Sequence, residues 1–214
     1  MTVNDNFAET FIDFLNNVGA ALGQEVIQLW RDAWELYDKV ERLKDPHKIE
    51  PLLRAVVLTA SAGFEAFTNF LAYRLVQAGE VAGHRLTESE MDCLEEKQRV
   101  LENGKITARK KLYSAKERYL LLFRLLGGNE DLPHNVRTEL DNSFKIRDQL
   151  VHPKPGQPVK LAENEGLNGM RAFYGFLNAD LHLWKLWREN EFSPAASAAG
   201  ELCEGTASAV PKRS

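Results

Sequence analysis

Apolar residues recur at steps of three and four along most of this 214-residue chain, the spacing of helices with one buried face. Proline and glycine residues divide the chain into segments, and nearly every segment shows this helical period. No run of alternating strand residues and no internal repeat stands out. The pattern therefore predicts an all-α protein, an antiparallel helical bundle of about five to six helices.

The first part of the chain predicts two long helical regions. One spans residues 7–43 with a bend near residues 19–23, and Asp45-Pro46 ends it. Its second half carries one apolar stripe, formed by Val26, Trp30, Ala33, Tyr37 and Val40. A second helix is expected to begin near Pro51, a good first-turn residue, and to reach Leu75.

Four further helices are expected after residue 86. Thr87-Glu88-Ser89-Glu90 has the form of a capping box and predicts a helix that continues to about Asn103-Gly104. The next helix is expected over residues 107–126. Pro133 opens another helix and Pro153 closes it, and the last helix is expected over about residues 164–190.

The chain ends in a segment of different composition. Residues 193–214 hold no aromatic residue and are rich in Ala, Ser and Gly, which predicts a disordered tail. Residues 1–192 are then expected to form one domain, with N-terminal helices over residues 5–44 packed on the rest. Hydrophobic residues make up 44% of the chain and charged residues 27%, which is usual for a soluble globular protein.

Composition also limits the compartment and the kind of site. The two cysteines, Cys93 and Cys203, lie far apart, which favours a reducing compartment. No secretion signal and no apolar run of about 18 residues is present, so we expect a cytoplasmic protein without membrane contact. The histidines are scattered and no nucleotide-binding loop occurs, so neither a metal nor another cofactor is expected. With a net charge of −4 and a pI near 5.8, any contact with RNA must be local.

The best candidates for catalytic residues are Arg147 and His152, which stand just before Pro153. Arginine is a permanent cation, and histidine titrates near neutrality. On an ideal helix the two would diverge by about 140°, but Pro153 disfavours helical geometry at His152. We therefore expect His152 at the helix end, free to swing towards Arg147. The same spacing also fits a solvated pair, or a histidine that stabilises the helix C-terminus.

RNA can be cut by its own 2′-hydroxyl if a base, an acid and a cation for the phosphorane charge are present. One histidine per chain does not readily serve as base and acid at the same moment. A dimer that brings two copies of the motif together would supply both. Lys145 and Lys154 flank the motif and are candidate phosphate contacts.

Other residues admit two interpretations each. Glu65, among apolar neighbours, either bonds to Arg147 or reaches solvent at the edge of the buried stripe. A basic stretch between Lys105 and Arg124 either collects RNA phosphates or forms a solvated helix face. The tryptophans fit the core or a dimer interface better than a platform for stacked bases. They are Trp30, Trp34, Trp184 and Trp187.

Three stretches resemble HEPN domains. The stretch LDNSFKIRDQLVHPKP, residues 140–155, resembles the HEPN signature of an arginine, a polar residue, a few further residues and a histidine. Residues 55–75 are similar to the family's small-residue helix with an embedded acid, here Glu65, and residues 110–128 resemble its middle portion. The similarity covers roughly residues 51–190. It implies an all-helical fold, commonly dimeric.

Many HEPN proteins are metal-independent endoribonucleases of toxin–antitoxin and defence systems, and others are non-catalytic modules that bind RNA or protein. Carried over, Arg147 and His152 would be the catalytic pair, and Asp148 would occupy the polar position that orients them or the scissile phosphate. The resemblance thus implies an endoribonuclease with RNA as substrate, a second copy as partner and an antitoxin or regulatory protein as regulator. The alternative is a non-catalytic helical dimer that binds RNA or a protein partner.

Overall fold

The computed structural model of the protein describes residues 12, 14–16, 24–43, 45–81, 83–102, 105–127, 131–155, 159, 161 and 167–191. The expected bend near residues 19–23 and the expected disordered tail, residues 193–214, lie outside the described residues. Within this part of the chain the order is α2 (Gln24–Glu41), α3 (Pro46–Ala78), β1 (Glu80–Val81), β2 (His84–Arg85), α4 (Glu88–Leu94), β3 (Lys97–Glu102), β4 (Lys105–Lys110), α5 (Ala115–Leu126), α6 (His134–Val151) and α7 (Leu167–Glu191).

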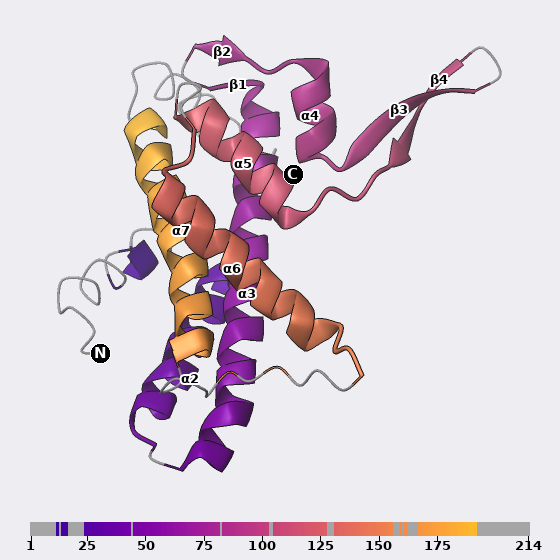
Figure 1. Cartoon of the computed structure of the whole chain (residues 1–214). Coiled ribbons are helices and arrows are strands. Elements are labelled where there is room, and N and C mark those ends of the chain that lie inside the picture. The colour runs from indigo at the N-terminus through magenta and orange to yellow at the C-terminus, as the bar shows by residue number, and fades with distance from the viewer. Residues whose placement is uncertain are drawn as a thin grey trace, which may run out of the picture.

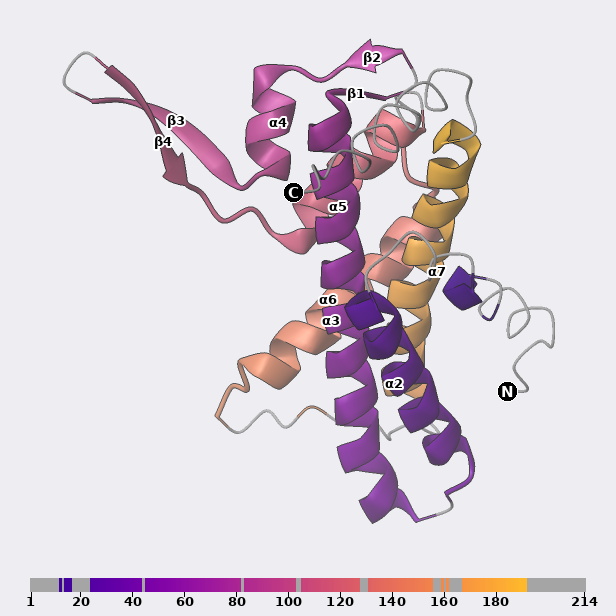
Figure 2. The same ribbon diagram turned by 180° about the vertical axis from the view of Figure 1, so that it is seen from behind.

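Helices dominate this part of the chain, as the hydrophobic pattern predicts. α3 runs through the middle of the bundle and contacts α2, α5, α6 and α7, while α6 packs mainly on α7 (Figure 1). Seen from behind, α2 lies beside the lower part of α3 (Figure 2). The predicted stripe on α2 is confirmed, because all five of its residues are buried. Trp30, Trp184 and Trp187 are also buried, which confirms them as core residues.

The start of α3 differs from the sequence prediction. The helix begins at Pro46 rather than near Pro51, because Asp45 caps it by accepting a hydrogen bond of 3.0 Å from the His47 N–H. Asp45-Pro46 therefore starts a helix, whereas α2 has already ended at Glu41. At the other end, Gly79 adopts a left-handed φ of 72° and closes α3.

α3 is also the one described helix that is long and apolar enough to cross a membrane. In its most apolar window, however, 56% of the residues are buried inside the bundle. That burial is typical of the core helix of a soluble protein, which agrees with the composition.

The segment between α4 and α5 corrects two predictions. The capping box of Thr87 and Glu90 is present, but its helix ends at Leu94 and not near residues 103–104. Residues 97–102 and 105–110, expected to be helical in large part, instead form the antiparallel pair β3 and β4. Glu96 stops α4 with a left-handed φ of 54°. The helix expected from residue 107 begins only at α5.

Two local signals explain this arrangement. Ser114 and Glu117 form a second capping box, which fixes the start of α5 at Ala115. The strands contain Val100, Ile106 and Thr107, residue types that favour an extended chain. The fold is therefore mostly helical with two short antiparallel ribbons, β1–β2 and β3–β4, and no closed sheet among the described residues.

Candidate functional site

Arg147 and Asp148 lie near the C-terminal end of α6, and His152 lies just beyond it. The predicted helix is confirmed: it follows Pro133, and it ends at Val151. His152 has left the helical conformation, with φ −122° and ψ 65°, but its backbone N–H still donates to the Asp148 carbonyl over 2.8 Å. Pro153 thus ends α6 at the expected position.

The Arg147 guanidinium bridges two carboxylates. Its Nη2 donates to Glu65 Oε1 over 3.1 Å, and its Nη1 donates to Asp148 Oδ1 over 2.9 Å. Glu65 comes from α3, 82 residues away in the sequence. The contact expected between Glu65 and Arg147 is therefore present. Both side chains are half-buried, at 28% exposure for Arg147 and 38% for Glu65, so solvent only partly screens the pair.

Aromatic packing next to this ion pair sets how α3 faces α6. The ring of Phe144 meets Phe64 edge-on at 5.5 Å and Phe176 edge-on at 5.1 Å. Phe64 directly precedes Glu65, and Phe144 stands three residues, about one turn, before Arg147. The aromatic contacts therefore hold the carboxylate and the guanidinium at bonding distance.

A second close contact brings α6 against α7. A Cβ atom on Gly175 would overlap Ser143 Oγ and would lie 2.7 Å from the Glu139 carbonyl oxygen. Ser143 is fully buried and donates to that same carbonyl over 2.8 Å. Sequence reasoning did not single out Gly175 or Phe144. A glycine inside a strongly periodic helix is the signal that could have marked the first of them.

The remaining predicted site residues are exposed. His152 is at the protein surface, and its imidazole forms no hydrogen bond with another described residue. Lys145 lies on α6 and Lys154 lies beyond its end, and neither forms an ion pair within the described part of the chain. Both lysines are thus near the motif in sequence, but no contact ties them to Arg147.

The three groups that contact one another in this site, one guanidinium and two carboxylates, carry a net negative charge. One guanidinium stands between the carboxylates of Glu65 and Asp148, so a phosphate that binds Arg147 has to use its remaining N–H donors or displace one carboxylate. Asp148, which directly follows Arg147 in the sequence, is the easier carboxylate to displace, because 59% of its side chain is exposed and solvent screens the ion pair. Glu65 would then keep the guanidinium oriented while its other nitrogen binds the phosphate in the fork geometry typical of arginine.

Large apolar side chains lie exposed on the same two helices. Leu58 precedes Glu65 by about two turns, Tyr73 follows it by about two turns, and Val151 follows Arg147 by about one turn. Their exposed fractions are 41%, 63% and 44%. Single exposed apolar side chains are common on soluble proteins, and these three are candidate contacts for a second molecule.

No protein-family model, curated protein or solved structure matches this chain. The assignment of a function therefore depends on the site itself and on the resemblance of its motif. Among the residues described, no group of three or more His, Cys, Asp or Glu side chains is arranged to hold a metal ion.

Proposed function

We propose that this protein is a metal-independent endoribonuclease of HEPN type that cleaves RNA at a composite site between two copies of the chain. The observation that carries the proposal is the ion pair of Arg147 with Glu65, one helical turn before the exposed His152. It combines an oriented cation with a proton-transfer group at the surface. A purely structural ion pair would not require the histidine.

In the proposed reaction the RNA 2′-hydroxyl attacks the adjacent phosphorus, and the bond from phosphorus to the 5′-oxygen breaks. His152 of one copy takes the proton of the 2′-hydroxyl, and the second copy's His152 gives a proton to the leaving 5′-oxygen. Arg147 neutralises the charge that develops on the non-bridging oxygens. The products are a 2′,3′-cyclic phosphate and a 5′-hydroxyl.

The second copy is supported by the exposed apolar residues beside the motif. Leu58, Tyr73 and Val151 would be covered if the two copies met through α3 and α6. That arrangement would also bring the two histidines to one cleft. The variant Leu58→Asp is therefore expected to be a monomer by sedimentation equilibrium and to lose cleavage while its helical circular dichroism is kept.

The biological setting is proposed from the resemblance alone. HEPN ribonucleases of toxin–antitoxin and defence systems act in the cytoplasm on cellular or invading RNA, and an antitoxin or regulatory protein controls many of them. We extend this setting to the present chain, with RNA as substrate and with Lys145 and Lys154 as candidate phosphate contacts.

One observation favours a second function. Both terminal nitrogens of Arg147 already donate to carboxylates, so the guanidinium is neutralised in the free protein. This suits a non-catalytic HEPN-like dimer that binds RNA or a protein partner, in which Arg147 only joins α3 to α6. The two functions differ in whether the loss of Arg147 abolishes chemistry or only lowers stability.

The deciding experiment measures RNA cleavage by the purified protein in EDTA. Wild type is compared with Arg147→Ala and His152→Ala, and with the exposed controls Arg137→Ala and His47→Ala. Cleavage that persists in EDTA, survives both controls and disappears in both motif variants supports the proposal. Mass spectrometry of the fragments should show the cyclic phosphate.

Two outcomes would count against the nuclease. A wild type that is free of bound protein and inert on varied RNAs would leave only the binding function. Cleavage that is retained by His152→Ala would assign the chemistry to other residues.

A further inference from the structure

The β3–β4 hairpin, residues 97–102 and 105–111 of the described chain, concentrates positive charge. Residues 97–111 hold six lysine and arginine side chains and one glutamate, a net charge of +5. The whole chain carries −4, so the remainder carries −9. A charge difference of this size within a small protein creates a local potential that attracts polyanions.

The hairpin extends away from the helices, at the upper right in Figure 1 and the upper left in Figure 2. All six residues of β4 are exposed, including Ile106 at 73%. The hairpin therefore contributes little to the core, and a two-stranded ribbon without such burial is only marginally stable.

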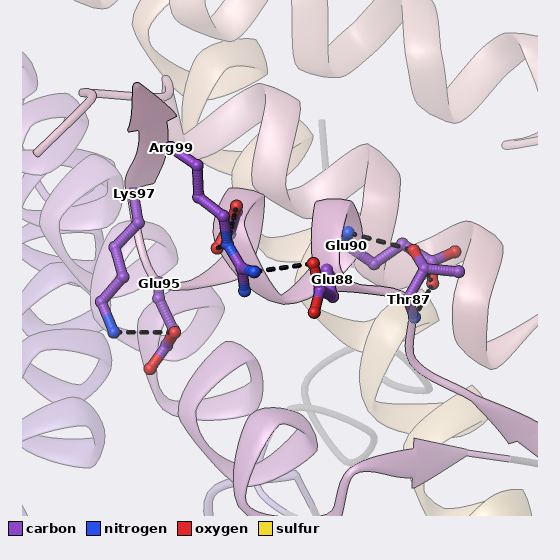
Figure 3. A network of polar contacts seen from close by, with 7 residues as sticks. Thr87, Glu88, Glu90, Glu95, Lys97 and Arg99 are labelled. Atoms are coloured by element: carbon purple, nitrogen blue, oxygen red, sulfur yellow. Dashed lines mark hydrogen bonds and ion pairs between the residues drawn. The ribbon is translucent and has the colours of Figure 1, made fainter. Parts of the chain in front are cut away.

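The base of the hairpin is nevertheless fixed to the bundle. Arg99 forms ion pairs with Glu88 over 2.6 Å and with Asp92 over 3.1 Å, both on α4, and Lys97 pairs with Glu95 over 2.8 Å (Figure 3). A short hairpin whose base is held in this way presents its outer part in a defined direction.

A second clamp joins the hairpin to α5. Glu96 accepts a backbone hydrogen bond of 2.8 Å from the Lys111 N–H, which closes the base of the ribbon. Its carboxylate pairs with the buried Arg118 over 3.3 Å. The left-handed backbone of Glu96 is thus held by partners on both sides, and the hairpin is continuous with the bundle.

The strand register separates two groups of cations. Residues directly opposite each other share one face of an antiparallel ladder. Arg99 points to α4, so the face away from α4 carries the pairs Gln98–Arg109, Val100–Thr107 and Glu102–Lys105. The acids of α4 therefore lie beside the face of Arg99, whereas Lys105 and Arg109 lie on the other face, where Glu102 stands opposite Lys105.

Lys111 adds a third cation just past the end of β4. Its Nζ lies 4.6 Å from the centre of the Tyr113 ring, a contact that orients the ammonium without neutralising it. The hairpin itself holds no aromatic side chain, so it offers no platform for stacked bases. Contact with a nucleic acid would be through phosphates and would tolerate any sequence.

We propose that the β3–β4 hairpin binds the phosphate backbone of RNA through Lys105, Arg109 and Lys111. The inference rests on the proposed function, in which RNA is the substrate, and it assigns the affinity for long RNA to a surface separate from Arg147 and His152. The remainder of the chain carries a net charge of −9, so outside the hairpin it attracts RNA only locally, as at Lys145 and Lys154.

The test measures RNA binding by fluorescence anisotropy in a His152→Ala background, so that the RNA stays intact. The hairpin variant carries Lys105→Gln, Arg109→Gln and Lys111→Gln. The control variant removes three exposed cations elsewhere and carries Arg31→Gln, Lys48→Gln and Lys185→Gln. The probe is a labelled single-stranded RNA of mixed sequence, with DNA of the same sequence as a second probe.

The hairpin variant should bind RNA at least about tenfold more weakly than its parent at low salt. The slope of log K against log salt should become shallower by about 2, because each phosphate on a single strand that the protein no longer neutralises changes the slope by roughly 0.7. A comparable weakening is expected on DNA, because phosphates are common to both. The control variant should keep the parent affinity and slope.

Three results would overturn the proposal: no binding by the parent, equal binding by the parent and the hairpin variant, or equal weakening in both variants. Equal binding would point instead to an acidic protein as the ligand of the hairpin. If RNA binding depends on the hairpin but wild type cleaves no RNA, the proposed nuclease function is wrong and the hairpin inference stands. Cleavage of long RNA with KM unchanged in the hairpin variant would do the reverse.

Discussion

The ring of Phe144 on α6 meets the ring of Phe64 on α3 edge-on, with 5.5 Å between centroids and 82° between planes. This contact stands one residue before Glu65 and about one turn before Arg147. It therefore fixes the register in which the two charged groups reach 3.1 Å. The geometry of the candidate site is set by core packing as well as by the motif.

Replacing Phe144 by alanine should lower both stability and site order. Removal of a buried phenylalanine lowers the free energy of unfolding by about 3 to 5 kcal/mol. Phe144 is only half-buried, so its removal should lower this free energy by about 3 kcal/mol or less. Urea denaturation measures this change. Phe144→Leu keeps most of the volume and should recover most of the stability. A Phe144→Ala variant as stable as wild type would show that the aromatic contact does not hold α6.

The coupling between Glu65 and Arg147 should be small but measurable. Exposed ion pairs contribute about 0.2 to 1 kcal/mol, and this pair is only half-buried, so we expect about 1 kcal/mol. A double-mutant cycle of Glu65→Gln and Arg147→Gln, followed by urea denaturation, isolates this term. If the single changes simply add, the bond is too weak to orient the guanidinium.

Much of the helical fold follows from the sequence. The stripe on α2, the capping box of Thr87 and Glu90, and the end of α6 at Pro153 all depend on spacings within one or two turns, which a sequence displays directly. The contact of Glu65 with Arg147 is one of two alternatives that the sequence leaves open. The choice between them depends on the packing of Phe64 and Phe144, whose pairing is a property of the tertiary structure.

The β3–β4 hairpin shows where helical periodicity misleads. Periodicity places Leu112 in a buried stripe, yet it is 76% exposed, because the chain reaches α5 only after Ser114. Asn103-Gly104, which would stop a helix, is also a strong signal for a two-residue hairpin turn between the segments that contain Val100 and Ile106. The sequence therefore predicts that the basic stretch lies on one helix. In the structure, part of this stretch lies on β4 and part lies on α5.

The anchor of the hairpin should control its order without controlling global stability. Arg99→Gln removes both ion pairs to α4, so the hairpin should open more often and trypsin should cut between residues 97 and 111 more rapidly. The thermal midpoint should stay unchanged, because the core is not touched. The control Arg31→Gln should be cut at the wild-type rate. Equal cleavage rates in all three proteins would show that the ion pairs do not hold the hairpin.

Asp180 should make stability depend on pH. It is fully buried, and burial holds the pKa of its carboxyl well above the ordinary value, although a hydrogen bond of 3.1 Å from Trp30 Nε1 opposes this shift. Its other oxygen has no partner among the described residues. The folded protein therefore keeps this carboxyl protonated at a pH where the unfolded chain has released the proton.

The sign follows from that difference in bound protons. Above the unfolded pKa of about 4, the unfolded state gains by ionising Asp180, so the free energy of unfolding falls as pH rises, until the folded pKa is reached. The loss is about 1.4 kcal/mol for each pH unit. Asp180→Asn keeps an acceptor for Trp30 and does not titrate, so its stability relative to wild type should increase from pH 4 towards neutrality. Urea denaturation across this range gives the answer, and a constant difference would rule out a protonated Asp180.

The close approach of α6 and α7 should make Gly175 intolerant of any side chain. Gly175→Ala would press a methyl group onto Ser143 and the Glu139 carbonyl, both of which are fixed by the backbone of α6. The gain in helix propensity is about 1 kcal/mol, whereas overpacking costs about 1 to 3 kcal/mol, so a net decrease in stability is expected in urea denaturation. If the added methyl group moves α6 away from α7, the contact of Arg147 with Glu65 should also weaken.

Gly169→Ala is the matched control on the same helix. The nearest atoms to its methyl group belong to the side chain of Leu53, at 3.0 to 3.3 Å, so they would have to give by only a few tenths of an ångström, much less than Ser143 Oγ and the Glu139 carbonyl would at Gly175. RNA cleavage, if present in wild type, should therefore fall in Gly175→Ala but not in Gly169→Ala. Equal stability and equal cleavage in the two variants would show that the α6–α7 contact does not support the site.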